Sequence, residues 1–157
     1  MANRHIILSA AVWPDDRAIV QALFREYAGS LAVDLCFQNF DDELANLPGK
    51  YDQPGGVVLL AHVDHAAAAV GCYRPLASGC EMKRLYVRPE FRGLGLGRRL
   101  AAHLIENARD AGHAFMVLDS LASMVEAQAL YRSIGFRTVP PYYDNPLPDT
   151  VYMRLDL

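Results

Sequence analysis

The sequence predicts a mixed α/β domain whose first half forms a largely antiparallel sheet. Short apolar runs with strand character alternate with segments of helical periodicity along the 157 residues. Three of these runs follow one another closely between 57 and 87, which favours antiparallel strands, although the alanine-rich run at 67–73 would suit a helix equally well. The length, with 52% hydrophobic and 21% charged residues, suits a single domain, 1–157, with a sizeable core.

The N-terminal half is expected to hold one strand, two helices and three further strands. Pro14, Asp15 and Asp16 place a proline and two acids at the start of the first helix, where both are favourable. Pro48 and Gly49 stop the second helix. The expected bounds are 4–12 for the first strand, 14–30 and 41–47 for the helices, and 57–63, 67–73 and 80–87 for the three strands.

The C-terminal half is expected to alternate helices with strands. After the glycines an apolar stripe at helical spacing is formed by Leu100, Leu104, Ile105 and Ala108, and Gly112 stands where a helix C-terminal cap belongs. Gly135 ends a later helix in the same way. The remaining elements are a strand at 115–118, a helix at 124–133 and strands at 136–139 and 151–155. The whole order is β-α-α-β-β-β-α-β-α-β-β.

Composition and charge exclude several classes of function. The net charge of −3 gives no reason to expect nucleic-acid binding. The apolar runs are too short to span a membrane, and the N-terminus lacks a secretory pattern, so we expect a cytoplasmic protein. Cys36, Cys72 and Cys80 are odd in number and lack a CxxC spacing, which indicates free thiols. The five histidines form no ligand pattern, so no metal is expected.

A glycine-rich segment follows the strand expected at 80–87. Gly93, Gly95 and Gly97 stand at alternate positions and lead into a segment with helical periodicity. Glycines let a backbone approach a ligand closely. The free N–H groups and the positive dipole end of the helix point at the same place. Strand, loop and helix start therefore predict a site that holds phosphate groups.

Two other nucleotide-binding patterns fit this segment less well. A Rossmann fold needs Gly-x-Gly-x-x-Gly after a strand and an acid about 20 residues further on. Asp119 meets the second requirement, but the glycines here are spaced Gly-x-Gly-x-Gly and little chain follows for a doubly wound sheet. A Walker loop fails because no Gly-Lys-Ser/Thr follows. An oxidoreductase with a nucleotide cofactor stays open as an alternative.

Two segments together resemble the GNAT acyltransferases. The acetyl-CoA signature of that superfamily resembles the segment Val87-x-Pro89-x-x-Arg92-Gly93-x-Gly95-x-Gly97-x-x-Leu100. The second conserved motif of the superfamily resembles Ala127-x-x-x-Tyr131-x-x-x-Gly135-Phe136. The resemblance implies a GNAT-like fold, with a mixed, mostly antiparallel twisted sheet of six to seven strands flanked by about four helices. It also implies an N-acetyltransferase that uses acetyl-CoA as donor and no metal.

The resemblance implies a role for each part of the donor site. Backbone amides of 93–98 would hold the pyrophosphate, and the preceding strand would be splayed from its neighbour so that its free backbone groups bind the pantetheine and polarise the acetyl oxygen. Tyr131 would protonate the departing thiolate. The cofactor-binding residues expected on this basis are Leu85, Tyr86, Val87, Arg92, Gly93, Leu94, Gly95, Leu96, Gly97, Arg98 and Ser120.

The base that deprotonates the amine is expected to be a carboxylate. Glu81 opens the strand that would reach the acetyl group, at a position where some GNAT branches carry a catalytic glutamate. It could instead be an ion-pair partner of Lys83 or Arg84. Asp119 is the second candidate, since it ends the strand across the expected splay.

The acceptor is expected to be a primary amine, and the short chain with its stiff C-terminal loop favours a small molecule, attacked directly in a ternary complex. Candidate acceptor-site residues are Tyr27, 38–40 and the proline- and tyrosine-rich loop 140–146.

The chain departs from the family pattern at Met124. Many relatives carry Asn at this position, and Ser123 could take over the role of that Asn. Met124 therefore motivates a second alternative, a non-catalytic module that binds or senses acyl-CoA. A homodimer is possible, although no apolar stripe demands one.

Overall fold

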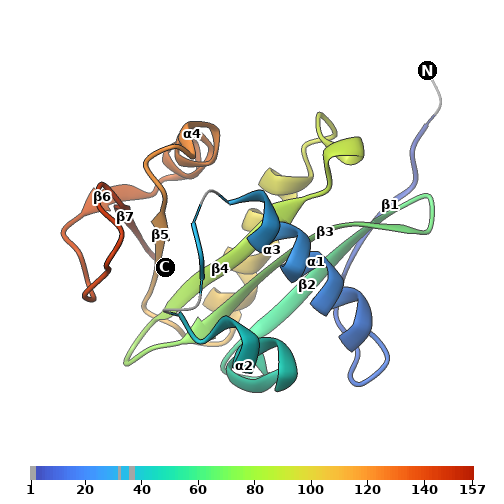
Figure 1. Cartoon of the computed structure of the whole chain (residues 1–157), viewed down its shortest axis with the longest axis horizontal. Helices are drawn as coiled ribbons and strands as arrows, with labels where there is room; N and C mark the ends of the chain where they lie inside the picture. The colour runs from blue at the N-terminus through green and yellow to red at the C-terminus, as the bar shows by residue number, and fades with distance from the viewer. Residues whose placement is uncertain (1–2, 32, 36–37) are drawn as a thin grey trace.

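The computed structural model describes residues 3–31, 33–35 and 38–157, so Cys36 lies outside the described residues. Seven strands form one sheet in the order β1-β2-β3-β4-β5-β7-β6 (Figure 1). Only β4 and β5 are parallel, and the other neighbours are antiparallel. The strands are β1 Ile6–Ala10, β2 Val57–Val63, β3 Ala66–Pro75, β4 Cys80–Val87, β5 Phe115–Ser120, β6 Arg137–Val139 and β7 Val151–Asp156. The predicted mixed sheet is confirmed.

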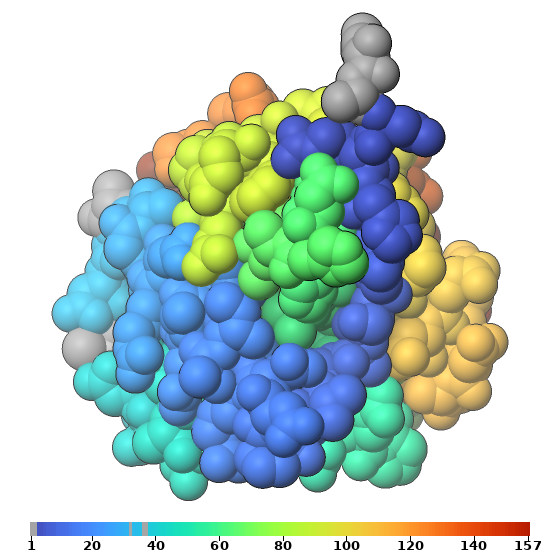
Figure 2. Space-filling model, turned by 90° about the vertical axis from the view of Figure 1, so that its right-hand side faces the viewer, coloured from blue at the N-terminus to red at the C-terminus, as the bar shows by residue number. Residues whose placement is uncertain are grey.

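Helices cover the sheet on both faces. The four α-helices are α1 Arg17–Ser30, α2 Phe40–Ala45, α3 Leu96–Asp110 and α4 Val125–Ile134, and the 3₁₀ turns are η2 Gly49–Tyr51 and η3 Pro89–Phe91. One core lies between the sheet and α1 and α2, and a second core lies on the opposite face with α3 and α4. β1 forms one edge of the sheet beside the β2–β3 hairpin, with α1 on the same side of the molecule (Figure 2). No helix of the described residues is long and apolar enough to cross a membrane.

The first helix begins later than its proline and acidic residues predict. Residues 13–16 form a turn, and α1 starts at Arg17. The reason is that Asp16 Oδ2 accepts a hydrogen bond from the Val12 backbone N–H at 2.7 Å, which holds the chain in a turn before the helix. Other bounds differ from the prediction by a few residues, as is usual at the ends of elements.

β4 changes direction at a bulge and then leaves β5. Its register with β3 shifts between Val70 and Cys72, and Arg84 in β4 has a φ of 60°. Only Cys80 and Glu81 pair with β5, so the two parallel strands separate beyond that point. Gly71 lies opposite the bulge, where an added Cβ would be 2.9 Å from Leu85 Cδ1. This separation is the splay that the sequence led us to expect, and it opens the site described next.

Candidate active site

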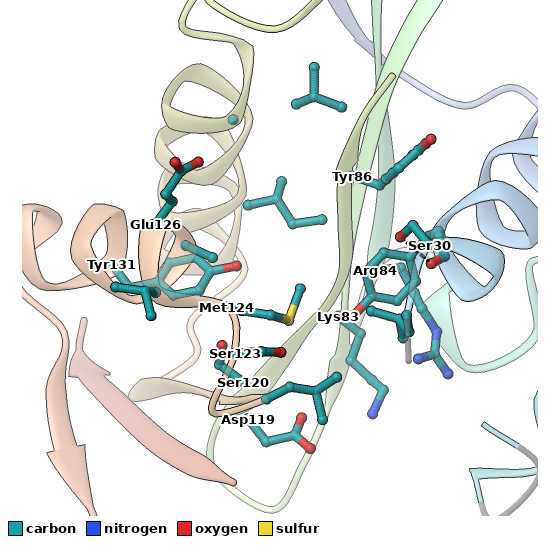
Figure 3. A pocket seen from close by; sticks show the side chains of 18 of the residues that line it. Ser30, Lys83, Arg84, Tyr86, Asp119, Ser120, Ser123, Met124, Glu126 and Tyr131 are labelled. Atoms are coloured by element: carbon teal, nitrogen blue, oxygen red, sulfur yellow. Dashed lines mark hydrogen bonds between the residues drawn. The ribbon is translucent and has the colours of Figure 1, made fainter. Parts of the chain in front are cut away.

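The splay between β4 and β5 forms a cleft of about 630 Å³ (Figure 3). We call it the splay cleft. One wall is the end of β4, the opposite wall is the end of β5 with the start of α4, and α1 contributes at the side. Its lining includes Tyr27, Gln38, Lys83, Arg84, Leu85, Tyr86, Val87, Arg92, Gly97, Asp119, Ser120, Ser123, Met124 and Tyr131. Six of the predicted cofactor-binding residues, from 85–87, 92, 97 and 120, therefore face one cavity.

The glycine loop lies beyond the end of β4 and leads into α3. Gly93 and Gly95 have φ values of 87° and 74°, a region that glycine enters without strain. Gly95 is the N-cap of α3, and the first turn of the helix carries no acidic residue. The first backbone N–H groups of α3 thus have no intrahelical acceptor and meet no competing carboxylate from that turn. This is the geometry of an anion site at a helix N-terminus.

The remaining predicted loop residues contribute in different ways. Gly93, Leu94, Gly95, Leu96 and Arg98 do not line the splay cleft itself. Leu96 is buried in the core under α3, so only its backbone could face a ligand. The Arg98 guanidinium donates a hydrogen bond to Ser133 Oγ at 2.7 Å, and Arg92 Nε donates one to the Val87 carbonyl at 3.2 Å. Arg92 therefore stays at the junction between β4 and the loop.

Tyr131 projects its hydroxyl into the splay cleft from α4 (Figure 3). Its ring packs edge-to-face against Phe136 at 5.7 Å between centroids. Within the part of the chain that the structure describes, no group is hydrogen-bonded to this hydroxyl. Burial raises the pKa of Tyr131, so the phenol keeps its proton at neutral pH. The side chain thus combines a packed ring with a free proton donor in the cleft.

Ser120 and the residues before α4 form the wall opposite β4. Gln128 Nε2 donates a hydrogen bond to the Leu121 carbonyl at 2.8 Å and reaches Ser120 Oγ at 3.5 Å. Met124 is the N-cap of α4, and its thioether and the Ser123 hydroxyl both face the cleft (Figure 3). The Ser123 hydroxyl is therefore available to a ligand in the cleft beside Met124.

Glu81 lies outside the splay cleft, in a buried ion-pair cluster. Its Oε1 accepts a hydrogen bond from Arg74 Nε at 2.8 Å, its Oε2 accepts one from the Tyr142 hydroxyl at 2.6 Å, and Lys83 Nζ is 3.8 Å from Oε1. Burial raises the pKa of Glu81, but Lys83, Tyr142 and Arg74 outweigh it and hold the pKa below the ordinary value. The expected partner Lys83 is present, whereas the second partner is Arg74 instead of Arg84.

Asp119 lines the splay cleft at the end of β5. Its Oδ2 accepts a hydrogen bond from the Tyr143 hydroxyl at 2.5 Å, and Asn145 Nδ2 donates to that hydroxyl at 2.9 Å. No hydrogen bond from the described residues reaches Asp119 Oδ1. One carboxylate oxygen of Asp119 therefore remains open toward the cleft.

Sequence reasoning did not anticipate the role of Arg84. Its guanidinium bonds Glu43 through Nε at 3.0 Å and through Nη2 at 3.2 Å, and it bonds Gln38 Oε1 through Nη1 at 2.9 Å. Both members of the ion pair are buried, with 3% and 4% of their side chains exposed. The contact ties α2 to the bulge of β4. No signal in the sequence joins residues so far apart.

A second cavity, of about 750 Å³, lies beside the splay cleft and shares Gln38 and Lys83 with it. We call it the basic pocket, because five basic side chains line it against two acidic ones. The charged lining residues are Lys50, Arg74, Lys83, Arg137 and Arg154, with Glu81 and Asp144. Of the predicted acceptor residues, Pro140, Tyr142 and Tyr143 line the basic pocket, Tyr27 lines the splay cleft, and Phe40 is packed in the core.

The chain is similar to known acetyltransferases in sequence and structure. Residues 17–136 match the acetyltransferase (GNAT) family. An uncharacterised N-acetyltransferase of Schizosaccharomyces pombe is 45% identical over 161 residues, which cover 100% of this chain and 98% of that protein. An L-amino acid N-acyltransferase of Escherichia coli is 40% identical over 52 residues, which cover 33% of this chain and 30% of that protein.

One similar solved structure, from Salmonella typhimurium, contains acetyl-CoA. The match has a TM-score of 0.75 and 22% identity, and it covers 96% of this chain and 93% of that chain. At this identity the likeness concerns the fold.

Proposed function

Because this chain belongs to the acetyltransferase (GNAT) family and is an N-acetyltransferase, we propose that it moves an acetyl group from acetyl-CoA to the primary amine of a small molecule. The splay cleft carries this proposal. It joins unpaired strand backbone and a free phenol in one cavity, and the helix N-terminus suited to phosphates adjoins that cavity at Gly97. A thioester donor with a diphosphate needs these features together.

In this proposal the donor lies along the splay cleft. The amides of Gly93 to Arg98 hold the pyrophosphate, with Arg92 at the edge of the loop. The backbone of Leu85, Tyr86 and Val87 binds the pantetheine and polarises the acetyl carbonyl, and Ser120 contacts the arm from the other wall. Because β5 does not pair with this part of β4, the strand leaves backbone groups for the ligand.

The reaction needs one proton removed and one supplied. We assign the acid to Tyr131, whose phenol stays protonated and faces the cleft. For the base, the contacts favour Asp119 over Glu81. Both oxygens of Glu81 already accept hydrogen bonds, whereas Oδ1 of Asp119 is open and faces the cleft. A role of Glu81 as the base stays a prediction, which the pH profile of Glu81→Gln tests.

The amine attacks the thioester directly in a ternary complex. Its neutral nitrogen forms a bond to the acetyl carbon, the C–S bond breaks, and the thiolate takes the Tyr131 proton. The nitrogen then loses a second proton, which restores the Tyr131 phenol. The two buried free thiols, Cys72 and Cys80, have raised pKa values because of burial and do not serve as acyl carriers. The expected cytoplasmic location and the possible homodimer stay predictions.

An amine screen with acetyl-CoA and free-thiol detection tests the proposal. We expect thiol release that depends on the amine, with an acetylated product by mass spectrometry. Asp119→Asn should abolish the acidic limb of the kcat/KM profile, whereas Glu81→Gln should keep it. If Glu81→Gln abolished the acidic limb and Asp119→Asn kept it, Glu81 would be the base.

Two alternatives have distinct outcomes in this screen. Binding of acetyl-CoA without turnover for any amine would favour the sensing module that Met124 suggested. Tight binding of NADH or NADPH, with none of acetyl-CoA, would favour the oxidoreductase.

A further inference from the structure

Lys83 is a mostly buried cation whose ion-pair partner, Glu81, is not within hydrogen-bond distance. Its side chain is 8% exposed, and it lines both the splay cleft and the basic pocket. The closest carboxylate oxygen, Glu81 Oε1, is 3.8 Å away and already accepts the Arg74 hydrogen bond. No described residue accepts a hydrogen bond from the Lys83 ammonium. An ammonium that opens onto two cavities with its three donors unused by the described residues favours an anionic ligand.

Asp119 and Lys83 carry opposite charges, and their charged groups lie at the same end of the splay cleft (Figure 3). Burial lowers the pKa of Lys83, while the charges of Glu81 and Asp119 oppose that shift and favour the ammonium form. The junction of the two cavities thus presents an anion with a free oxygen beside a cation with free donors. This charge pair is complementary to a small molecule that carries an ammonium and a carboxylate close together.

The rest of the basic pocket supports an anionic ligand with an apolar part. The whole chain has a net charge of −3, yet this cavity concentrates basic side chains. Some of their charge is already balanced, since Arg137 and Arg154 share Asp156 and Lys50 contacts Glu43. Phe115, Val117 and Val139 add apolar surface on which an aliphatic or aromatic group could pack.

We propose that the acceptor is an amino acid, whose carboxylate binds Lys83 and whose ammonium lies at Asp119. This inference rests on the proposed function and names the substrate class of that site. Asp119 takes one ammonium proton, directly or through water. The neutral nitrogen then attacks the thioester carbon, the C–N bond forms as the C–S bond breaks, and Tyr131 protonates the sulfur. The nitrogen loses its second proton, which restores the Tyr131 phenol, and Asp119 releases its proton to solvent. The products are an N-acetyl amino acid and CoA.

Matched acceptors test the role of the carboxylate. Leucine and phenylalanine are compared with their decarboxylated forms, isopentylamine and phenethylamine, and with leucinamide. We expect kcat/KM for each amino acid to exceed that for its amine by at least about tenfold, as a charge-assisted hydrogen bond implies. Similar values for acid and amine would overturn the inference while leaving the proposed function intact.

Substitution of Lys83 tests the binding residue. Lys83→Gln should remove the preference, by lowering kcat/KM for the amino acid much more than for isopentylamine, and Lys83→Arg should keep part of it. Arg109→Gln, an exposed change at the far end of α3, controls for net charge. An equal loss with both acceptors in Lys83→Gln would contradict the assignment, and the thermal midpoint of each variant checks folding.

A binding measurement separates failure of the inference from failure of the proposed function. If no amine is acetylated, the proposed function is wrong. Titration calorimetry on the CoA-saturated chain then tests the pocket alone. Binding of leucine but not isopentylamine supports the inference, and binding of neither overturns it.

Discussion

Tyr131 shows how one side chain can serve both packing and chemistry. Its ring lies against Phe136, and its hydroxyl faces the splay cleft with no hydrogen-bond partner among the described residues. A structural tyrosine in a core usually satisfies its hydroxyl. Tyr73 is such a case, because its hydroxyl donates to Asn107 Oδ1 at 2.5 Å. The two tyrosines therefore form a matched pair for substitution.

Tyr131→Phe should lower kcat by about 100-fold, the usual contribution of a positioned acid, and leave KM for acetyl-CoA nearly unchanged. Tyr73→Phe should leave kcat unchanged and cost about 1 kcal/mol of stability through its lost hydrogen bond. Steady-state kinetics and urea unfolding of both variants provide the measurement. Equal kcat values for wild type and Tyr131→Phe would exclude the acid role.

The ion pair between Glu43 and Arg84, which lies at the bulge of β4, makes the stability of the fold depend on pH. Burial raises the pKa of Glu43, but the Arg84 hydrogen bonds and charge and the Lys50 charge outweigh it, so the pKa lies below the unfolded value of about 4.3. A lowered native pKa stabilises the fold above the unfolded pKa, and this contribution is lost as the pH falls through the native pKa.

Glu43→Gln should therefore cost about 3 kcal/mol at pH 7, because it leaves the buried Arg84 without its counter-ion. The cost should shrink below about pH 4, where the wild type also loses this contribution. Urea unfolding between pH 3 and pH 7 measures both effects. Glu106→Gln, on the exposed face of α3, is the control, and a pH-independent difference would refute the linkage.

At the scale of elements, the glycine loop was predictable because its information is local. The positive φ values of Gly93 and Gly95 and the helix start at Leu96 follow from glycine spacing and helical periodicity. Of the two ion-pair partners of Glu81, the sequence predicted one. Lys83 is near in sequence, but Arg74 faces Glu81 from β3 through strand register, and the bulge turns Arg84 toward α2.

Gly95 and Gly97 should respond differently to alanine. Gly95 has a φ of 74°, where alanine costs about 1 kcal/mol. A Cβ at Gly97 would meet its nearest neighbour at 3.7 Å, an ordinary contact. We expect Gly95→Ala to lower stability and to raise KM for acetyl-CoA more than Gly97→Ala does. Equal effects of both substitutions on KM and stability would contradict this view of the loop.

At the scale of the whole molecule, the splay leaves only two residues of β5 paired with β4 among the described residues, so the sheet is weakly continuous at that point. A donor in the splay cleft would touch both walls and so link the two sides of the sheet. Acetyl-CoA at 100 times its Kd should stabilise the chain by about 2.7 kcal/mol. For this chain length that is a rise of roughly 5–10 °C in the thermal midpoint.

This stabilisation separates donor binding from catalysis. Tyr131→Phe should show nearly the same shift in thermal midpoint as the wild type, because the phenol acts on the departing thiolate. Gly95→Ala should show a smaller shift, because the loop amides hold the pyrophosphate. No shift for the wild type would show that acetyl-CoA is not the donor.

The central claim is direct acetyl transfer from acetyl-CoA to an amine in one ternary complex. Initial rates measured with acetyl-CoA and an accepted amine varied together test it most directly. Intersecting double-reciprocal lines are expected, with one N-acetyl product formed per thiol released. Parallel lines, which indicate an acetyl-enzyme intermediate, or thiol release without an acetylated amine would contradict it.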